Sequence, residues 1–220
     1  MASLTGAKRY LEVGVFKGQT FTHLHFVQQD AVDPAFQFNT QLHQAPGRRF
    51  FPITSDEFFR TGQALPSYDL IFLDGLHTFE QTFRDFCASL AHAHAATVWV
   101  IDDTVPSDLF SALRDMQTSL KLRAEAGLKS RKWHGDVFKT LFAIHDFFPT
   151  FDFRTVVDDG NEQTIIARSP RAGFEPRWND LEAISRLSYL DFQANRSLLN
   201  EVSSEEMFGW LTGLDLSAKR

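Results

Sequence analysis

The hydrophobic pattern of the chain alternates between short apolar runs and longer segments with helical spacing. Apolar runs of about five residues, bounded by polar or turn residues, are typical of strands buried on both faces. The predicted strands cover residues 9–13, 30–33, 48–54, 68–73 and 97–101. The predicted helices cover residues 18–25, 79–91, 107–122 and 138–148. Strands that alternate with helices indicate a parallel sheet with helices on both faces.

The last third of the chain departs from this alternation. Residues 151–157 and 163–168 are predicted strands joined by the turn sequence Asp-Asp-Gly-Asn, so we expect an antiparallel hairpin. Residues 179–200 are predicted to form a helix that packs on the domain or on a second subunit as a homodimer contact. The expected fold is therefore α/β, a Rossmann-like, doubly wound, seven-stranded mixed sheet. Residues 1–170 would form the main domain and residues 171–220 its C-terminal helical extension.

Composition narrows the class of protein. The 220 residues suffice for one domain, and the net charge of −6 comes with no basic stripe, which argues against a nucleic-acid partner. The single cysteine, Cys87, excludes an intrachain disulfide and a CxxC metal site. No apolar run approaches 18 residues and no signal peptide is evident, so we expect a cytoplasmic protein without a membrane contact.

A glycine-containing turn follows the first predicted strand. Its pattern is Glu12-x-Gly14-x-x-x-Gly18, and a carboxylate, Asp33, follows at the end of the second strand. An acid in that place can accept hydrogen bonds from a ribose diol, and glycines let the backbone approach a ligand. A carboxylate repels a phosphate but attracts an aminoacyl ammonium, so the pattern favours S-adenosylmethionine over a dinucleotide. The alternatives are an ordinary tight turn and, for Asp33, a turn acid before Pro34.

Residues after the third strand and around the turn complete the predicted cofactor site. Ser55 and Asp56 follow that strand, where such folds place groups near the adenine; the alternative is a plain helix N-cap. The full predicted set is Glu12, Gly14, Val15, Phe16, Lys17, Gly18, Thr20, Asp33, Ser55, Asp56 and Asp74.

Acidic residues also follow two neighbouring strands. Asp74 ends the fourth predicted strand, and Asp102 and Asp103 end the fifth. Carboxyl ends of parallel strands meet at one sheet edge, where converging carboxylates need a counter-ion such as Mg²⁺. His77 lies three residues after Asp74 and has the ordinary pKa of a general base near neutral pH. The alternatives are a cofactor neighbour for Asp74, a backbone-bonded helix start for His77, and a helix cap for Asp102 or Asp103.

The segments around residues 11–21, 69–77 and 100–104 resemble class I S-adenosylmethionine-dependent methyltransferases. They are most similar to the small-molecule O-methyltransferases related to the macrocin and mycinamicin sugar methyltransferases, over roughly residues 8–168. The resemblance implies that Asp74 is a metal ligand, that His77 is the base, and that Asp102 and Asp103 are further ligands. It differs in that Glu occupies the position of Asp102 in those relatives. It also implies a helix before the first strand, so the chain is either trimmed or has a different active-site lid.

A second dense group of residues lies at Trp133 and His134, which follow a basic segment at 129–132. Aromatic faces suit sugars and planar rings, so these two side chains are predicted to contact a small-molecule acceptor. The alternative is a loop in which Asp136 caps the next helix. The sequence therefore predicts an O-methyltransferase acting on a small molecule, with a sugar hydroxyl of a glycoside or natural product as one candidate acceptor. The competing hypothesis is an inactive cofactor-binding partner or regulatory module; a nicotinamide-dependent oxidoreductase lacks its glycine pattern.

Overall fold

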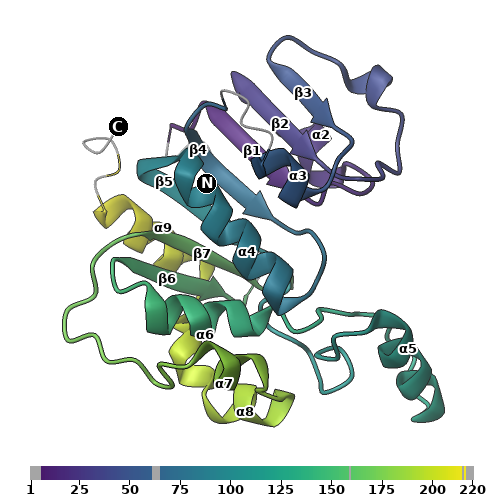
Figure 1. Cartoon of the computed structure of the whole chain (residues 1–220), viewed down its shortest axis with the longest axis vertical. Coiled ribbons are helices and arrows are strands. Elements are labelled where there is room, and N and C mark those ends of the chain that lie inside the picture. The colour runs from purple at the N-terminus through teal and green to yellow at the C-terminus, as the bar shows by residue number, and fades with distance from the viewer. Residues whose placement is uncertain (1–5, 61–64, 159, 215, 217–220) are drawn as a thin grey trace.

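The protein is built around one mixed eight-stranded sheet. The structure is a computed structural model that describes residues 6–60, 65–158, 160–214 and 216. The strand order is β3-β2-β1-β4-β5-β7-β6-β8 (Figure 1). The strands are β1 (Arg9–Val13), β2 (Gln28–Val32), β3 (Arg48–Phe51), β4 (Tyr68–Leu73), β5 (Ala93–Ile101), β6 (Phe151–Val156), β7 (Gln163–Arg168) and β8 (Glu201–Val202).

The sheet confirms the expected Rossmann-like, doubly wound α/β fold. Strands β1 to β5 pair in parallel, and β7 pairs antiparallel with both β5 and β6, so the predicted hairpin is present. Every residue of β4 is buried, as expected for a strand covered on both faces. The strand order reverses between β1 and β4, and in open parallel sheets ligands bind beyond the carboxyl ends of the strands at such a point.

Helices cover both faces of the sheet. One apolar cluster joins one face to α3, α4 and α6, and a second cluster joins the other face to α2 and α9 (Figure 1). The helices are α2 (Gln19–His23), α3 (Ser55–Arg60), α4 (Phe79–Ser89), α5 (Met116–Glu125), α6 (Phe138–Phe147), α7 (Leu181–Ser185), α8 (Tyr189–Ala194) and α9 (Ser204–Gly213). Short 3₁₀ turns are η1 (Thr40–His43), η2 (Leu90–His92) and η3 (Arg196–Leu199).

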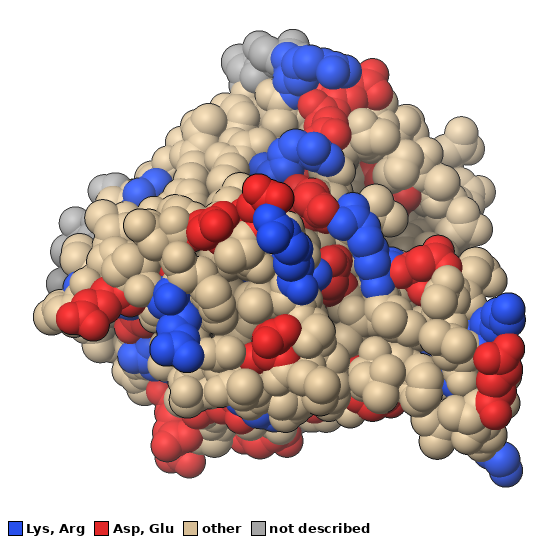
Figure 2. All heavy atoms as spheres, turned by 60° about the horizontal axis from the view of Figure 1, so that its bottom comes forward, with Lys and Arg blue, Asp and Glu red and all other residues tan. Residues whose placement is uncertain are grey.

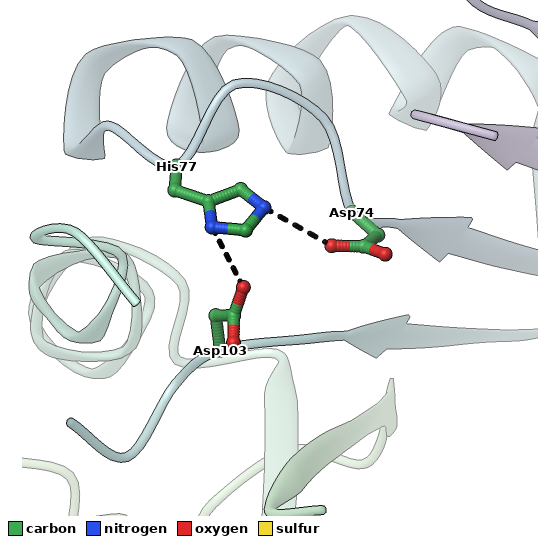
Figure 3. A group of neighbouring side chains, drawn as sticks. All are labelled: Asp74, His77 and Asp103. Carbon is green, nitrogen blue, oxygen red and sulfur yellow. Dashed lines mark ion pairs between the residues drawn. The ribbon is translucent and has the colours of Figure 1, made fainter. Parts of the chain in front are cut away.

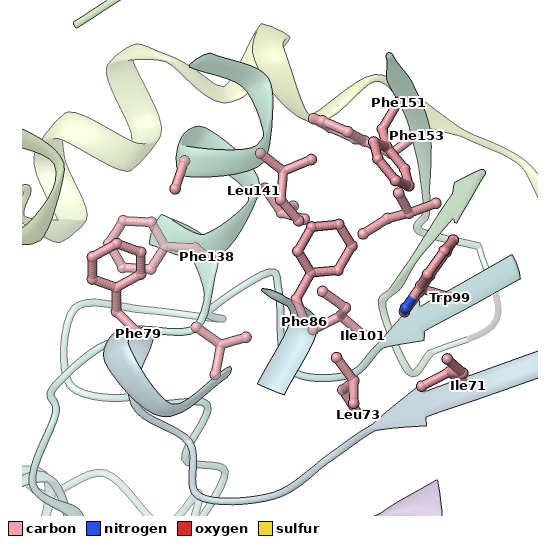
Figure 4. Close-up of a cluster of buried hydrophobic side chains, with 14 of the residues drawn as sticks. Ile71, Leu73, Phe79, Phe86, Trp99, Ile101, Phe138, Leu141, Phe151 and Phe153 are labelled. Atoms are coloured by element: carbon pink, nitrogen blue, oxygen red, sulfur yellow. The ribbon is translucent and has the colours of Figure 1, made fainter. Parts of the chain in front are cut away.

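Aromatic side chains make up much of the first cluster (Figure 4). Phe86 of α4 contacts Trp99 of β5 and Phe151 of β6 edge to face, with ring centroids 5.7 and 5.6 Å apart. Edge-to-face rings contribute roughly 0.5–1.5 kcal/mol beyond the burial of their area. Many of the 23 phenylalanines are thus explained by packing. Cys87 is partly buried beside them as a free thiol.

The predicted helix at residues 107–122 is wrong in its bounds. Residues 107–115 form turns, and α5 begins only at Met116. The Asp108 carboxylate accepts the backbone N–H groups of Phe110 and Ser111, which favours a turn, and Asp115 then caps α5 through Thr118 N at 2.7 Å. Leu109 is 52% exposed, and α5 lies away from the sheet (Figure 1).

The single helix predicted for residues 179–200 is also wrong. The segment divides into α7, α8 and η3, because Asp180 and Ser188 each cap a new helix and Asn200 adopts a left-handed backbone with φ 51°. The chain then forms β8, which pairs in parallel with β6 at the sheet edge. This is the eighth strand, where seven were expected. Helix α9 follows and packs on the same face of the sheet as α2, in the second apolar cluster.

Surface charges are mixed. On the face shown in Figure 2, Lys and Arg side chains lie interspersed with Asp and Glu side chains. Among the residues that the structure describes, none of the helices has the length and apolar character needed to cross a membrane.

Candidate active site

The glycine turn after β1 lies at the reversal point of the sheet. Gly14 has φ 84°, and a Cβ there would lie 1.9 Å from the carbonyl oxygen of Asp74. The carboxyl ends of β1 and β4 therefore approach so closely that only glycine fits. Gly18 has φ 71° and precedes α2, with the Phe38 ring against it. Of the other predicted turn residues, Val15 is buried, whereas Phe16, Lys17 and Thr20 are exposed.

Asp33 lies at the carboxyl end of β2, directly beside the turn. Its Oδ2 accepts the backbone N–H groups of Val15 and Phe16 at 2.9 and 2.7 Å, and its Oδ1 accepts that of Ala35 at 2.7 Å. The carboxylate thus fixes the turn, which holds Phe16 at the unusual φ of 47° for a residue other than glycine. The open hydrogen-bonding capacity of Asp33 is on Oδ1, which accepts only one bond in the described structure.

Glu12 is buried inside the sheet, with 2% of its surface exposed. Its Oε2 accepts the hydroxyl of Tyr10 at 2.6 Å. Burial raises the pKa of Glu12 to about 8, although the Tyr10 hydrogen bond acts in the opposite direction. Glu12 is therefore a protonated, buried side chain at neutral pH, directly before the glycine turn.

Ser55 and Asp56 at the start of α3 belong to a polar cluster with residues of α4. The Gln81 amide donates to Ser55 Oγ, Asp56 Oδ1 and Asp85 Oδ1 at 3.1, 3.1 and 2.9 Å. Burial raises the pKa of Asp85 to about 6. Gln81 and Asp85 are not among the residues predicted from the sequence, although their spacing of four residues puts them on the same face of one helix.

The centre of the candidate site is an ion-pair chain from two strand ends (Figure 3). Asp74 follows β4, His77 lies in the turn before α4, and Asp103 follows β5. His77 Nδ1 is 2.8 Å from Asp103 Oδ2, and His77 Nε2 is 3.4 Å from Asp74 Oδ1. One ligand atom from each of the three lies within 4.8 Å of the others. The predicted convergence of these acids with His77 is thus present.

Asp102 is near this group but is not one of its three members. Its Oδ1 accepts the N–H of Asp103 at 2.9 Å and the side-chain amide of Asn161 at 3.4 Å. Asp103 has a left-handed backbone, φ 58°, which turns the chain between the two carboxylates. The predicted metal ligands therefore divide: Asp74 and Asp103 flank His77, and Asp102 faces the β6–β7 connection.

Electrostatics in the site follow from burial and from the crowded carboxylates. Burial alone lowers the pKa of His77, but the hydrogen bonds to Asp103 and Asp74 outweigh it and raise that pKa to about 10. Burial, with Asp74 and Asp103 nearby, raises the pKa of Asp102 to about 7. Burial also raises the pKa of Asp74. With its pKa at about 10, the His77 imidazole between these carboxylates is protonated at neutral pH.

Trp133 and His134 lie beside His77. The Trp133 ring stacks on the His77 ring with centroids 4.9 Å apart and planes inclined by 13°, and its Nε1 donates to Leu113 O at 2.6 Å. His134 is buried, its Nδ1 lacks a partner among the described residues, and its Nε2 is 3.9 Å from Asp103 Oδ1. Trp133 thus covers one face of the imidazole.

The donor atoms present fit a divalent cation. Carboxylate oxygens of Asp74 and Asp103 converge beside an imidazole nitrogen of His77, and carboxylate oxygens are donors that suit a divalent metal. Among the described residues, these two carboxylates form ion pairs only with histidines and not with Lys or Arg.

Comparisons with known proteins bear on the fold and on the part of the chain that contains the site. A family model described as a methyltransferase domain matches residues 11–104, which contain the glycine turn, Asp33 and the Asp74–His77–Asp103 group. The sequence matches no curated protein.

Solved structures share the fold. A proposed caffeoyl-CoA O-methyltransferase from Staphylococcus aureus is 14% identical, with a TM-score of 0.51, over 76% of this chain and 78% of the other. Cofactor-bound Rv0187 from MTB is 13% identical, with a TM-score of 0.54, over 77% of this chain and 76% of the other. At these identities the likeness establishes the shared Rossmann-like fold.

Proposed function

We propose that this chain is an S-adenosylmethionine-dependent methyltransferase that methylates an oxygen atom of a small molecule. The match of residues 11–104 to a methyltransferase-domain model and the shared fold support this proposal. The observation that carries the proposal is the Asp74–His77–Asp103 chain at the strand ends beside the glycine turn. It puts a proton acceptor and two carboxylates next to the predicted cofactor site. Both solved neighbours named above share the fold, and the first bears an O-methyltransferase description.

The cofactor would lie across the reversal point between β1 and β4. Gly14 and Gly18 leave room for it, and the free lone pair of Asp33 Oδ1 would accept a ribose hydroxyl. Ser55 and Asp56, joined through Gln81, would border the adenine. A methyl sulfonium transfers its methyl group by direct displacement, so the protein mainly positions and deprotonates the acceptor.

His77 would take the acceptor proton. The two flanking carboxylates hold its pKa at about 10, so it serves as a base only where their negative charge is offset. A divalent cation such as Mg²⁺, held by Asp74 and Asp103, would supply that charge and would polarise the acceptor hydroxyl. Trp133 and His134 would then border the acceptor. We place Asp102 outside this set of ligands.

Calorimetry on the full chain tests the proposal. We expect S-adenosylmethionine and its demethylated product to bind. Asp33→Ala should abolish binding because the glycine turn loses two hydrogen bonds and the ribose loses its proposed acceptor. We expect heats of Mg²⁺ binding to disappear in Asp103→Ala and to persist in the matched variant Asp102→Ala. Absence of binding by both cofactor forms would contradict the proposed function.

Turnover separates an enzyme from an inactive cofactor-binding module. We expect the demethylated cofactor to accumulate when the protein is incubated with a panel of glycosides and phenols. His77→Gln should abolish this product while cofactor binding stays within about twofold. Cofactor binding without turnover of any acceptor in the panel would favour the inactive module.

A further inference from the structure

The turn that carries His77 is held by a segment distant in sequence. Residues 133–136, here called the clamp segment, contact this turn at three points. The Trp133 ring covers the His77 ring. Gly135 lies so close that a Cβ there would be 1.7 Å from the carbonyl oxygen of His77, and its φ is 62°. Only glycine can occupy that position without displacing the His77 backbone.

The third contact caps the helix that begins after His77. Helix α4 starts at Phe79, and Thr78 at its N-cap position makes no side-chain cap bond. Instead Asp136 Oδ1 accepts the N–H of Phe79 at 2.8 Å, from 57 residues away. The N–H of Phe79 is one of the four donors at a helix start that have no partner within the helix. The sequence position of Asp136 offers it as a cap for α6, but its side chain caps α4.

A buried lysine connects Asp136 to the C-terminal part of the chain. Lys139 Nζ is 3.0 Å from Asp136 Oδ2 and donates to the carbonyl oxygen of Ser185 in α7 at 2.7 Å. Asp136 and Lys139 are only 4% and 8% exposed. Buried charges are found almost only in pairs. This ion pair therefore connects the start of α4 to α6 and α7, and it is here called the joint.

We infer that Asp136 and Lys139 are positioning residues for His77, and that they link the active site to the segment after residue 170. The inference rests on the proposed function in that His77 is taken as the base. Neither residue touches the reacting atoms: they hold the end of α4, and thereby the turn from which His77 reaches Asp74 and Asp103. Removing either partner leaves the other charge buried and unpaired. Loss of either side chain should therefore weaken both the cap on α4 and the contact with α7.

Histidine-side-chain NMR on the full chain tests this inference at one fixed pH. The His77 ring signals are assigned by their loss in His77→Gln. We expect Asp136→Ala and Lys139→Met to move or broaden these signals. The matched controls are Asp115→Ala, which removes the exposed cap of α5, and Lys121→Met, which removes an exposed lysine of the same helix. Both controls should leave the His77 signals in place.

Thermal unfolding is recorded for all four variants. Loss of a helix cap also lowers stability in Asp115→Ala, so a lower melting temperature alone does not identify a positioning role. If Asp136→Ala does not fold, Lys139→Met decides. His77 signals that superimpose on the wild type in the folded variants overturn the inference. Calorimetry with the demethylated cofactor is run in parallel: a wild type that binds no cofactor contradicts the proposed function, while a shift of the His77 signals still supports the positioning role.

Discussion

At the scale of single residues, the site depends on backbone positions that few side chains can occupy. Gly14 lies against the backbone of Asp74, directly after β4, and Gly135 lies against the backbone of the His77 turn. The sequence analysis identified Gly14 from its motif, because a glycine directly after a strand is a recognisable signal. It could not identify Gly135, since its contact is with a residue 58 positions earlier in the chain and no local pattern encodes that contact.

Replacement of Gly14 by alanine should strongly destabilise the protein. The substitution adds a strained φ and a Cβ that meets backbone 1.9 Å away. We expect a loss of more than about 3 kcal/mol in the free energy of unfolding, measured with urea. Gly173→Ala is the matched control, because Gly173 also has a positive φ, 66°, but nothing within 4 Å of its Cβ position. It should cost about 1–2 kcal/mol, and equal losses in the two variants would contradict the steric argument.

The buried Glu12 should make stability fall as pH rises. Its pKa is about 8 in the folded protein and near the ordinary 4.5 in the unfolded chain. Between these values the unfolded chain releases the proton and the folded protein keeps it, so the free energy of unfolding decreases by about 1.4 kcal/mol per pH unit. Glu12→Gln is neutral in both states and lacks this slope.

Urea unfolding of wild type and Glu12→Gln at several values from about pH 5 to about pH 8 tests this sign. The variant should gain stability relative to the wild type as the pH rises. Parallel curves for the two proteins would mean that Glu12 has an ordinary pKa in the fold.

At the scale of elements, bounds were predictable where burial alone defines them. Strands β1 and β4 have the predicted bounds, since short, mostly apolar segments buried on both faces leave little freedom. Helices near the surface were mispredicted where side chains cap the backbone. The carboxylate of Asp108 stops the helix expected at 107, and Ser188 starts α8 in the middle of the helix expected at 179–200. Such competition between side chain and backbone is weakly encoded in hydrophobic periodicity.

One buried carboxylate should control the segment that leads to α7. Asp146 at the end of α6 accepts the backbone N–H groups of Arg177, Trp178 and Asn179 at 2.8, 2.6 and 2.8 Å. Burial alone would raise the pKa of Asp146, but these hydrogen bonds and the one to His145 lower it. Asp146→Ala should expose three amides and cost about 2–4 kcal/mol.

Amide hydrogen exchange of residues 177–179 measures this effect. Exchange there should accelerate in Asp146→Ala and stay slow in β4. Because a depressed pKa contributes stability above the unfolded value, that contribution should be lost as the pH falls through the folded pKa. Unchanged exchange at 177–179 would show that other contacts hold the segment.

At the scale of the whole molecule, the last part of the chain completes the sheet: β8 adds its edge strand and α9 covers one of its faces. The sequence predicted the architecture and the edge where Asp74, His77 and Asp103 meet, because parallel strand ends converge by topology. It did not predict β8 or α9. A two-residue edge strand has no hydrophobic period, and α9 shows its role only through the sheet face that it covers.

Substitutions in α9 test whether this helix stabilises the sheet face that it covers. Leu211 of α9 is 3% exposed against the sheet, whereas Leu190 of α8 is 75% exposed. We expect Leu211→Ala to cost about 2–5 kcal/mol in the free energy of unfolding and Leu190→Ala less than about 0.5 kcal/mol. Denaturant unfolding followed by circular dichroism compares the two. Similar small losses would mean that α9 contributes little to the sheet face.

The joint of Asp136 and Lys139 also sets the order in which the site is completed during synthesis. Residues 11–104 contain the glycine turn, Asp33 and all three members of the ion-pair chain. The cap on α4 comes from 57 residues later, and the lysine that holds this cap reaches a carbonyl another 46 residues on. Contacts of such long separation form late. A ribosome-bound chain can therefore shape its cofactor turn well before its histidine is fixed, and a competent site waits until Ser185 has emerged from the ribosome.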